Sequence, residues 1–195
     1  METMPGRNIT ADTTKGHAAL FYETPEEQLE ILAQFFKDGV EQNELCIYVS
    51  SQPTEDILEQ FATHGFDARP AVSETNLRIF EMDKTYMPNG QFVANYMLHN
   101  LQDFIDDAKA AGYHGLRTAG EMIWIHDHPD AVNEAISYED HVNDMTGDGS
   151  NFVGLCLYPS YTSHSHLLPG ILSTHPTVIY GGNVHANDYY SLPAA

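Results

Sequence analysis

Short apolar runs alternate with longer segments of helical character along the chain, and this order constrains the fold more than any other feature. The strand-like runs are 17–22, 45–50, 76–82, 115–125, 151–159 and 177–180. Helices are expected between them, at about 25–42, 54–64, 90–111, 130–146 and 166–174. Such an order is typical of a parallel sheet covered by helices on both faces. The sequence therefore predicts an α/β fold with a three-layer, mostly parallel sheet.

One domain between two short tails is the expected organisation. The 195 residues suffice for a single core of ordinary size. Residues 1–15 are polar and lack the apolar segment of a signal peptide, so we expect a flexible tail there. Residues 16–190 carry no repeat or linker and are expected to form the domain, followed by a C-terminal tail at 191–195. No apolar run reaches the roughly 20 residues of a membrane span, so we expect a cytoplasmic protein without membrane contact.

Acidic residues outnumber basic ones by 28 to 8, which gives a net charge of −20 at pH 7. They are spread along the chain rather than gathered in one tail. Because concentrated salt screens the repulsion within such a surface, we expect a halophilic, archaeal source. Direct binding of nucleic acid is not expected, because few cations are present to neutralise a row of phosphates.

The junction between the first strand and the first helix decides how the chain relates to nucleotide-binding enzymes. The first half resembles the opening of KaiC and RecA-like ATPases, in which a glycine-rich loop with a lysine holds phosphate. Here residues 22–27 read Tyr-Glu-Thr-Pro-Glu-Glu, with no glycine, no lysine and three carboxylates. Each carboxylate about 4 Å from a phosphate would cost roughly 4 kcal/mol at an effective dielectric of about 20. We therefore expect neither nucleotide nor any other cofactor.

The same junction contains a complete helix start. Thr24 and Glu27 have the spacing of a capping box, and Pro25 stands at the first helical position. Capping is therefore the predicted role of Thr24 and Glu27. Glu23 lies outside the box, and its role stays open.

Several short strings, in this order and spacing, resemble one sensory family. They are His17 with Phe21-Tyr22-Glu23, Gly120-Glu121-Met122-Ile123-Trp124, Tyr138-Glu139 with Asn143, Cys156-Leu157-Tyr158, His175-Pro176, and Asn187 with Tyr189-Tyr190. Over residues 16–190 the chain resembles the MEDS domain, named for methanogens, methylotrophs and the regulator DcmR. The resemblance implies a KaiC-like fold without nucleotide chemistry, a role in signal transduction and small hydrocarbon-derived ligands.

The resemblance also bears on partners. Members of the family often carry a DNA-binding or kinase module, and this sequence shows none. We therefore expect the signal to pass to a protein partner, either a regulator or a kinase. A homodimer is an option for the oligomeric state.

A ligand site is expected beyond the carboxyl ends of the strands, where open parallel sheets bind ligands. An aromatic rim with few polar groups at this edge suits a small, mainly apolar ligand. Ordinary packing is the alternative for each of these aromatic residues. The predicted ligand-binding residues, which include His17 from the family strings, are His17, Tyr22, Glu23, Glu121, Trp124, Tyr158 and Tyr161.

Two charged residues interrupt the predicted strand 115–125, where a central strand should be apolar throughout. Strand alternation places Arg117 and Glu121 on the same face, roughly 13 Å apart, so each needs its own partner if buried. Glu121 is the predicted polar contact to a ligand. A structural ion pair or hydrogen bond is the alternative.

Histidines provide a competing interpretation. The pairs His126/His128 and His164/His166 follow predicted strands, and residues two apart in an extended segment point the same way. Together with Glu121 or Asp127, such a pair could hold a metal ion in an open, hydrolase-like site. The main expectation is that no metal is bound.

Nucleophilic catalysis is not expected, and no catalytic residue is predicted. The strand-like runs that contain Cys46 and Cys156 favour core packing for both cysteines, with a redox pair as the alternative. Ser50, Ser51 and Ser160 lack the context of a nucleophile elbow. Three functions remain: a ligand-binding sensory domain that is not an enzyme, a KaiC-like interaction scaffold without ligand, and a metal-dependent hydrolase.

Overall fold

Within residues 17–146, 151–160 and 166–190, which the computed structural model describes, seven strands form one sheet. Their order is β3-β2-β4-β5-β1-β6-β7, and the first six strands are parallel. Only β7 at the edge is antiparallel. The bounds are β1 (His17–Tyr22), β2 (Leu45–Ser50), β3 (Leu77–Glu81), β4 (Leu116–Glu121), β5 (Phe152–Pro159), β6 (Thr177–Tyr180) and β7 (Asn183–Ala186). The predicted tails 1–15 and 191–195 lie outside the described residues.

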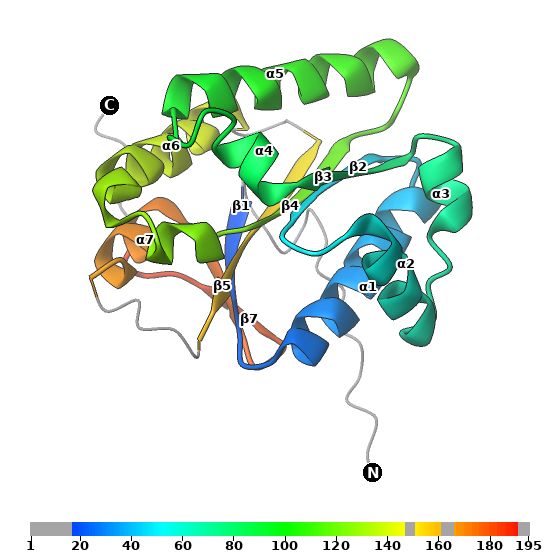
Figure 1. Ribbon diagram of the computed structural model, residues 1–195, viewed down its shortest axis with the longest axis horizontal. Coiled ribbons are helices and arrows are strands. Elements are labelled where there is room, and N and C mark those ends of the chain that lie inside the picture. Colours follow the sequence, from blue (N-terminus) through cyan, green and yellow to red (C-terminus); the bar gives the residue numbers. More distant parts are fainter. Residues whose placement is uncertain (1–16, 147–150, 161–165, 191–195) are drawn as a thin grey trace.

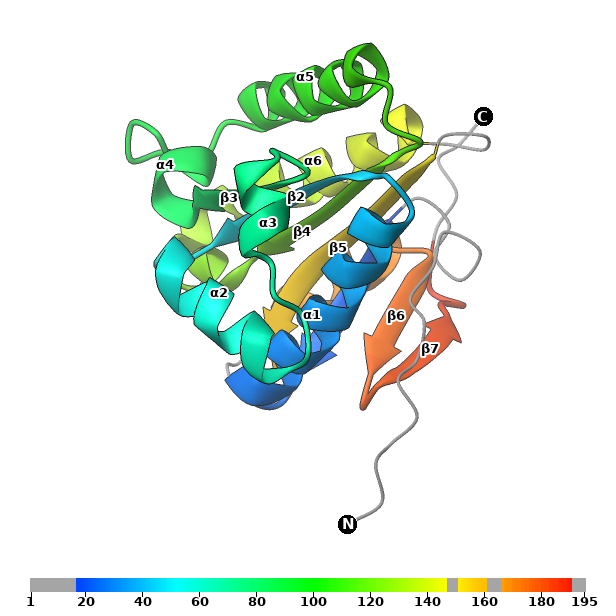
Figure 2. The ribbon, with the colours of Figure 1, turned by 90° about the vertical axis from the view of Figure 1, so that its right-hand side faces the viewer.

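Helices cover both faces of the sheet, which confirms the predicted three-layer α/β fold (Figures 1 and 2). The first face, here the α1 face, carries α1 (Pro25–Glu41), α2 (Thr54–Thr63) and α3 (Arg69–Ser73). The second, the α6 face, carries α4 (Met82–Tyr86), α5 (Ala94–Ala111), α6 (Val132–Met145) and α7 (Leu168–Thr174). Within the described ranges, no helix has the length and apolar character needed to cross a membrane.

Strand alternation divides the core between the two faces. In β1, Leu20 and Tyr22 pack toward the α1 face, while Ala19 and Phe21 pack toward the α6 face. The α1 face is filled by residues such as Phe36 from α1 and Phe61 from α2. Because successive side chains of a strand point to opposite faces, neighbours in sequence contribute to separate cores.

The strand β4 ends at Glu121, and the prediction that it extends to residue 125 was wrong. Met122 still donates a backbone hydrogen bond to Leu157 but leaves the extended conformation, with φ −100° and ψ 11°. The short 3-10 helix η1 (Ile123–His126) follows, and Trp124 and Ile125 are buried in it. The apolar run after Glu121 therefore indicates buried residues but not a strand, because a short apolar run does not distinguish a strand from a buried helical turn.

Other differences lie at short elements. The sequence prediction missed α3, α4 and β7, and α5 begins at Ala94 rather than near residue 90. The strand β7 has no buried apolar face, so its pattern gives no alternation. A usable signal precedes it, since Gly181 and Gly182 have φ values of +53° and +65° and join β6 to β7. A Gly-Gly pair between two strands is a typical hairpin turn.

Candidate functional site

A buried carboxylate joins the carboxyl ends of β2 and β4 on the α1 face. Glu121 is 3% exposed and accepts hydrogen bonds from the hydroxyls of Tyr48 at 2.6 Å and Ser50 at 2.8 Å. Its second oxygen accepts from the backbone N–H of Ser51 at 3.0 Å and from the Ser51 hydroxyl at 2.5 Å. The amide of Gln28 in α1 adds a longer contact of 3.4 Å. A carboxylate has about four lone-pair positions, so these donors saturate Glu121.

Arg117 and Glu121 each have their own partners, as the spacing along β4 predicts. The Arg117 guanidinium is fully buried and donates to Glu44 Oε2 at 2.5 Å and to the Phe35 carbonyl at 3.0 Å. It also lies 4.7 Å from the centre of the Phe35 ring. Both charged residues of β4 therefore have structural roles on the α1 face, because their buried hydrogen bonds hold β4 to neighbouring segments.

The strand–helix junction that holds phosphate in the ATPases is closed by its own side chains. Thr24 caps α1 by accepting from the Glu27 N–H at 3.1 Å, as predicted. The Glu27 carboxylate accepts from the Glu23 N–H at 2.7 Å, so the Glu23 backbone also takes part in the helix start. The Glu23 carboxylate is exposed and accepts from the Tyr180 hydroxyl at 2.9 Å.

The predicted aromatic rim does not form one pocket. Tyr22 packs on the α1 face, whereas Trp124 and Tyr158 pack on the α6 face, so the sheet separates them. All three are buried, and Trp124 stacks on Phe92 with ring centres 4.8 Å apart. Tyr161 lies outside the described residues. The physical reason for the difference is the alternation within β1 and β5, which sends residues at the same edge to opposite faces.

A small cavity lies instead over the middle of the sheet on the α6 face. Its volume is about 50 Å³. Most of its wall is apolar. The polar residues of the wall come from β1, α4, β4 and α6, and Cys156 of β5 lies beside them. The lining residues are His17, Ile47, Val49, Tyr86, Met97, Leu101, Phe104, Thr118, Ala119, Gly120, Tyr138, Glu139, Val142, Phe152, Gly154, Leu155 and Cys156.

Two glycines keep the sheet surface open beneath this cavity. A Cβ atom at Gly120 would lie 2.0 Å from the Tyr86 hydroxyl. One at Gly154 would lie 2.8 Å from the Phe152 ring and 3.1 Å from the His17 Cβ. Glycine is therefore required at both positions, because Tyr86 of α4 and the Phe152 and His17 side chains leave no room for a Cβ atom.

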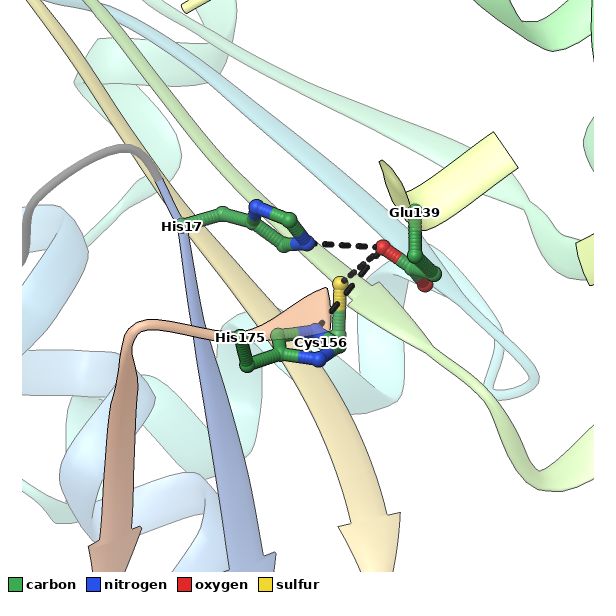
Figure 3. A group of neighbouring side chains, drawn as sticks. All are labelled: His17, Glu139, Cys156 and His175. Atoms are coloured by element: carbon green, nitrogen blue, oxygen red, sulfur yellow. Dashed lines mark hydrogen bonds and ion pairs between the residues drawn. The ribbon is translucent and has the colours of Figure 1, made fainter. Parts of the chain in front are cut away.

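Four polar side chains gather in one group (Figure 3), and three of them, His17, Glu139 and Cys156, also line the cavity. They are His17 from β1, Glu139 from α6, Cys156 from β5 and His175 from the segment after α7, and their ligand atoms all lie within 4.8 Å of one another. We call them the His17–His175 group. The Glu139 Oε2 atom is central: His17 Nε2 donates to it at 2.9 Å and the Cys156 thiol at 3.3 Å, and His175 Nε2 lies 3.8 Å away.

Burial controls the ionisation of this group. Burial, together with the neighbouring His17, lowers the pKa of His175 to about 3. Burial raises the pKa of Cys156 well above its usual range, and the charge of Glu139 raises it further. Burial opposes ionisation of Glu139, yet the hydrogen bond from His17 holds the pKa of Glu139 below its usual value. At neutral pH the group therefore contains a carboxylate, a thiol and a neutral His175.

The predicted histidine pairs do not form a comparable cluster. Within the described ranges, only the His17–His175 group brings three or more His, Cys, Asp or Glu ligand atoms together. His126 ends η1 and His128 follows a turn, so this pair does not lie in the extended segment that the prediction assumed. His126 is half exposed and lies 3.7 Å from Asp127, while the His128 side chain is partly buried. Of the second pair, His166 is exposed and His164 lies outside the described residues.

The two cysteines are not a redox pair. Both are free thiols. Cys46 packs on the α1 face and Cys156 on the α6 face, so the sheet lies between them. The expected core packing therefore describes Cys46, whereas Cys156 also belongs to the His17–His175 group.

Of this group, only His17 was among the residues predicted for the site. Glu139, Cys156 and His175 each stand in one of the strings that carry the family resemblance. Nothing in local spacing joins them, because His17 and Glu139 are 122 positions apart. Their shared membership in those strings was the available signal.

Comparison with known families supports the reading of the strings. The model of the MEDS family (methanogen/methylotroph, DcmR sensory domain) matches residues 16–176. The chain belongs to the MEDS family. This membership gives the chain a sensory role in signal transduction.

Comparison with solved structures supports the fold. A KaiC-like protein of the hyperthermophilic archaeon Pyrococcus horikoshii matches this MEDS domain with a TM-score of 0.59 and 15% identity. The match covers 89% of this chain and 80% of that protein. At this identity the likeness concerns the fold alone. A comparison with curated proteins gave no match.

Proposed function

We propose that this MEDS domain senses a small, mainly apolar molecule that enters the cavity between the sheet and helices α5 and α6. The size and lining of the cavity support the proposal. About 50 Å³ suits a molecule of a few heavy atoms, since about 10–15 Å³ measured this way holds one water. The Tyr86, Tyr138 and Glu139 side chains line an otherwise largely apolar wall and can orient one polar substituent.

The proposed ligand class is a chain of one to four carbons with a single polar or halogen substituent. Burial raises the pKa of Tyr86 and of Tyr138 well above the usual range, so both phenols stay neutral and can donate hydrogen bonds. A permanently charged ligand suits this site poorly, because its desolvation on entry is costly.

The proposed output is a protein partner, a regulator or a kinase, in the cytoplasm of a halophilic archaeon. The net charge of −20 supports a protein partner over nucleic acid, because phosphates would be repelled. It also supports the salt-rich setting, because salt screens repulsion within the surface.

The proposal excludes ATP hydrolysis. Three observations support this part: the carboxylates of the junction, the cap that Thr24 provides, and the hydrogen bonds that hold Glu23 and Glu27 in place. Millimolar Mg-ATP should leave the melting temperature unchanged. A rise of several degrees would contradict this part of the proposal.

The test of ligand binding is a thermal-shift screen of short alcohols, amines and halogenated alkanes in high salt. A ligand at 100 times its dissociation constant stabilises the folded state by about 2.7 kcal/mol. For a domain of this size that raises the melting temperature by roughly 5–10 °C. The variant Leu101→Phe fills part of the cavity and should abolish the shift, because Leu101 lines it.

Leu168→Phe is the matched control, because Leu168 is 40% exposed and lies outside the cavity lining. This variant should keep the full shift. If no compound shifts the wild type, the ligand-free scaffold becomes the better interpretation. If Leu101→Phe keeps the shift, the ligand binds outside this cavity and the proposed site is wrong.

A further inference from the structure

The His17–His175 group offers the donor set of a transition-metal site. It brings together two imidazole nitrogens, one sulfur and one carboxylate oxygen from four different elements (Figure 3). A tetrahedral ion with bonds of 2.0–2.3 Å separates its ligand atoms by about 3.3–3.8 Å. The distances from Glu139 Oε2 to the other three ligand atoms are 2.9, 3.3 and 3.8 Å. Small side-chain rotations therefore suffice to surround one ion.

The hydrogen bonds within the group leave several buried atoms unused. Among the described residues, His17 Nδ1, Glu139 Oε1 and His175 Nε2 have no hydrogen-bond partner. All three side chains are 0–1% exposed. Buried polar atoms are normally satisfied, so the unpaired His175 Nε2, which lies 3.8 Å from Glu139 Oε2, indicates a missing binding partner.

The orientation of His175 is the sharpest observation. Its Nδ1 lies 2.8 Å from the Ile171 carbonyl, which can only accept, so Nδ1 carries the ring proton. The opposite nitrogen, Nε2, therefore presents a lone pair toward Glu139 Oε2 at 3.8 Å. A lone pair that faces a carboxylate is repelled unless a cation lies between them. A metal-bound histidine is commonly held in orientation by the same kind of hydrogen bond from its other ring nitrogen to a backbone carbonyl.

We propose that His17, Glu139, Cys156 and His175 together bind one divalent late first-row transition-metal ion, with Zn²⁺ the ion best suited to the donor set. Mixed imidazole, thiolate and carboxylate ligands select this class over Mg²⁺ and Ca²⁺, which take oxygen ligands. On binding, the thiol proton of Cys156 passes to the solvent, and the ring proton of His17 moves from Nε2 to Nδ1, which frees Nε2 for the ion. The site differs from the histidine pairs 126/128 and 164/166.

The ion would stand at one wall of the cavity, because His17, Glu139 and Cys156 also line it. Metal binding does not depend on a small molecule in the cavity. The metal proposal and the proposed sensory function can therefore fail separately, and metal alone is the probe for the first.

The experiment uses the untagged full chain, stripped with a chelator and titrated with Zn²⁺ and with Co²⁺. We expect one ion per chain by elemental analysis after gel filtration. The Co²⁺ form should show a sulfur-to-metal charge-transfer band in the near ultraviolet and strong visible bands of a four-coordinate ion. Absence of stoichiometric binding at micromolar metal would overturn the proposal.

Three variants locate the ion. Cys156→Ser should remove the charge-transfer band. Cys156→Ser and His175→Ala should each weaken the affinity for the metal at least about 100-fold, because loss of a residue that only supports a ligand already costs about 10–100-fold. Circular dichroism checks that each variant is folded. The control His126→Ala/His128→Ala should bind as the wild type does. If this control loses the ion while Cys156→Ser keeps it, the site has been assigned wrongly.

Discussion

Two buried glutamates on opposite faces of the sheet have very different surroundings. Glu121, on the α1 face, is 3% exposed and accepts hydrogen bonds from four side-chain or backbone donors within 3.0 Å. Glu139, on the α6 face, is 1% exposed, and among the described residues only His17 and Cys156 donate to its side chain. Its second oxygen has no hydrogen-bond partner in the same part of the chain.

The difference separates a structural carboxylate from one that is free to bind. Saturation of Glu121 leaves no lone pair for a ligand, although the sequence favours Glu121 as the ligand contact. Glu139 keeps unused acceptor capacity next to a cavity and to nitrogen and sulfur ligand atoms. Both carboxylates are buried, so burial does not separate the structural one from the candidate ligand. The number of hydrogen-bond donors around each carboxylate separates them.

The largest expected effect is the loss of the Glu121 network. Glu121→Gln replaces one carboxylate oxygen, which only accepts hydrogen bonds, with an amide nitrogen, which donates them. If this nitrogen takes the place of Oε2, two donors face each other, because the Ser51 N–H is fixed in the backbone. We expect the free energy of unfolding to fall by about 2–4 kcal/mol, because each unsatisfied buried donor costs roughly 1–3 kcal/mol. Urea unfolding monitored by circular dichroism measures it. Glu23→Gln, at an exposed carboxylate, is the control and should change stability by less than about 0.5 kcal/mol.

A methyl group beneath the cavity should have the next largest effect. Gly120→Ala places a Cβ 2.0 Å from the Tyr86 hydroxyl, so α4 has to move. The expected destabilisation is about 1–3 kcal/mol, as for other overpacked cores, together with loss of the ligand-induced thermal shift. Gly39→Ala is the counterpart on the α1 face, where a Cβ would lie 2.7 Å from Arg117 Cδ. It should destabilise the domain but leave ligand affinity unchanged, and equal loss of affinity in both variants would contradict the assigned cavity.

The matched substitution on the α6 face should cost much less than that of Glu121. In metal-free protein, Glu139→Gln disturbs only the two hydrogen bonds to Oε2. The other oxygen, Oε1, already has no hydrogen-bond partner among the described residues, so its loss adds little to the cost. We expect the free energy of unfolding to fall by about 1 kcal/mol. Urea unfolding in the presence of a chelator measures it. A cost equal to that of Glu121→Gln would show that the two carboxylates have the same structural role.

The smallest expected effect concerns Cys46 on the α1 face. Burial raises the pKa of Cys46 to about 12, so at pH 8 the residue remains a thiol, which is the unreactive form. Iodoacetamide at pH 8 should therefore leave Cys46 unlabelled in the folded protein and modify it fully in urea, as measured by mass spectrometry. Labelling of Cys46 in the native state within minutes would contradict this account of the core.

The order of the main elements and the type of sheet could be predicted from local patterns in the sequence. Periodicity and capping depend on neighbours within a few residues, so β1, α1 and β2 could be located closely, as could the cap at Thr24. The need of Arg117 and Glu121 for separate partners also followed from the sequence, since it depends only on strand spacing. The family strings identified the MEDS domain for the same reason, because they are read directly from the chain.

The position of the candidate site could not be predicted in this way, because it depends on contacts between distant segments of the chain. The register of β1 against β5 sets His17 opposite Gly154, two residues before Cys156 on the same face. Docking of α6 then brings Glu139 to this point, and the end of α7 brings His175. These contacts join residues up to 122 positions apart in a single hydrogen bond. No local pattern encodes such contacts, because strand order, register and helix docking follow from burial of the whole core.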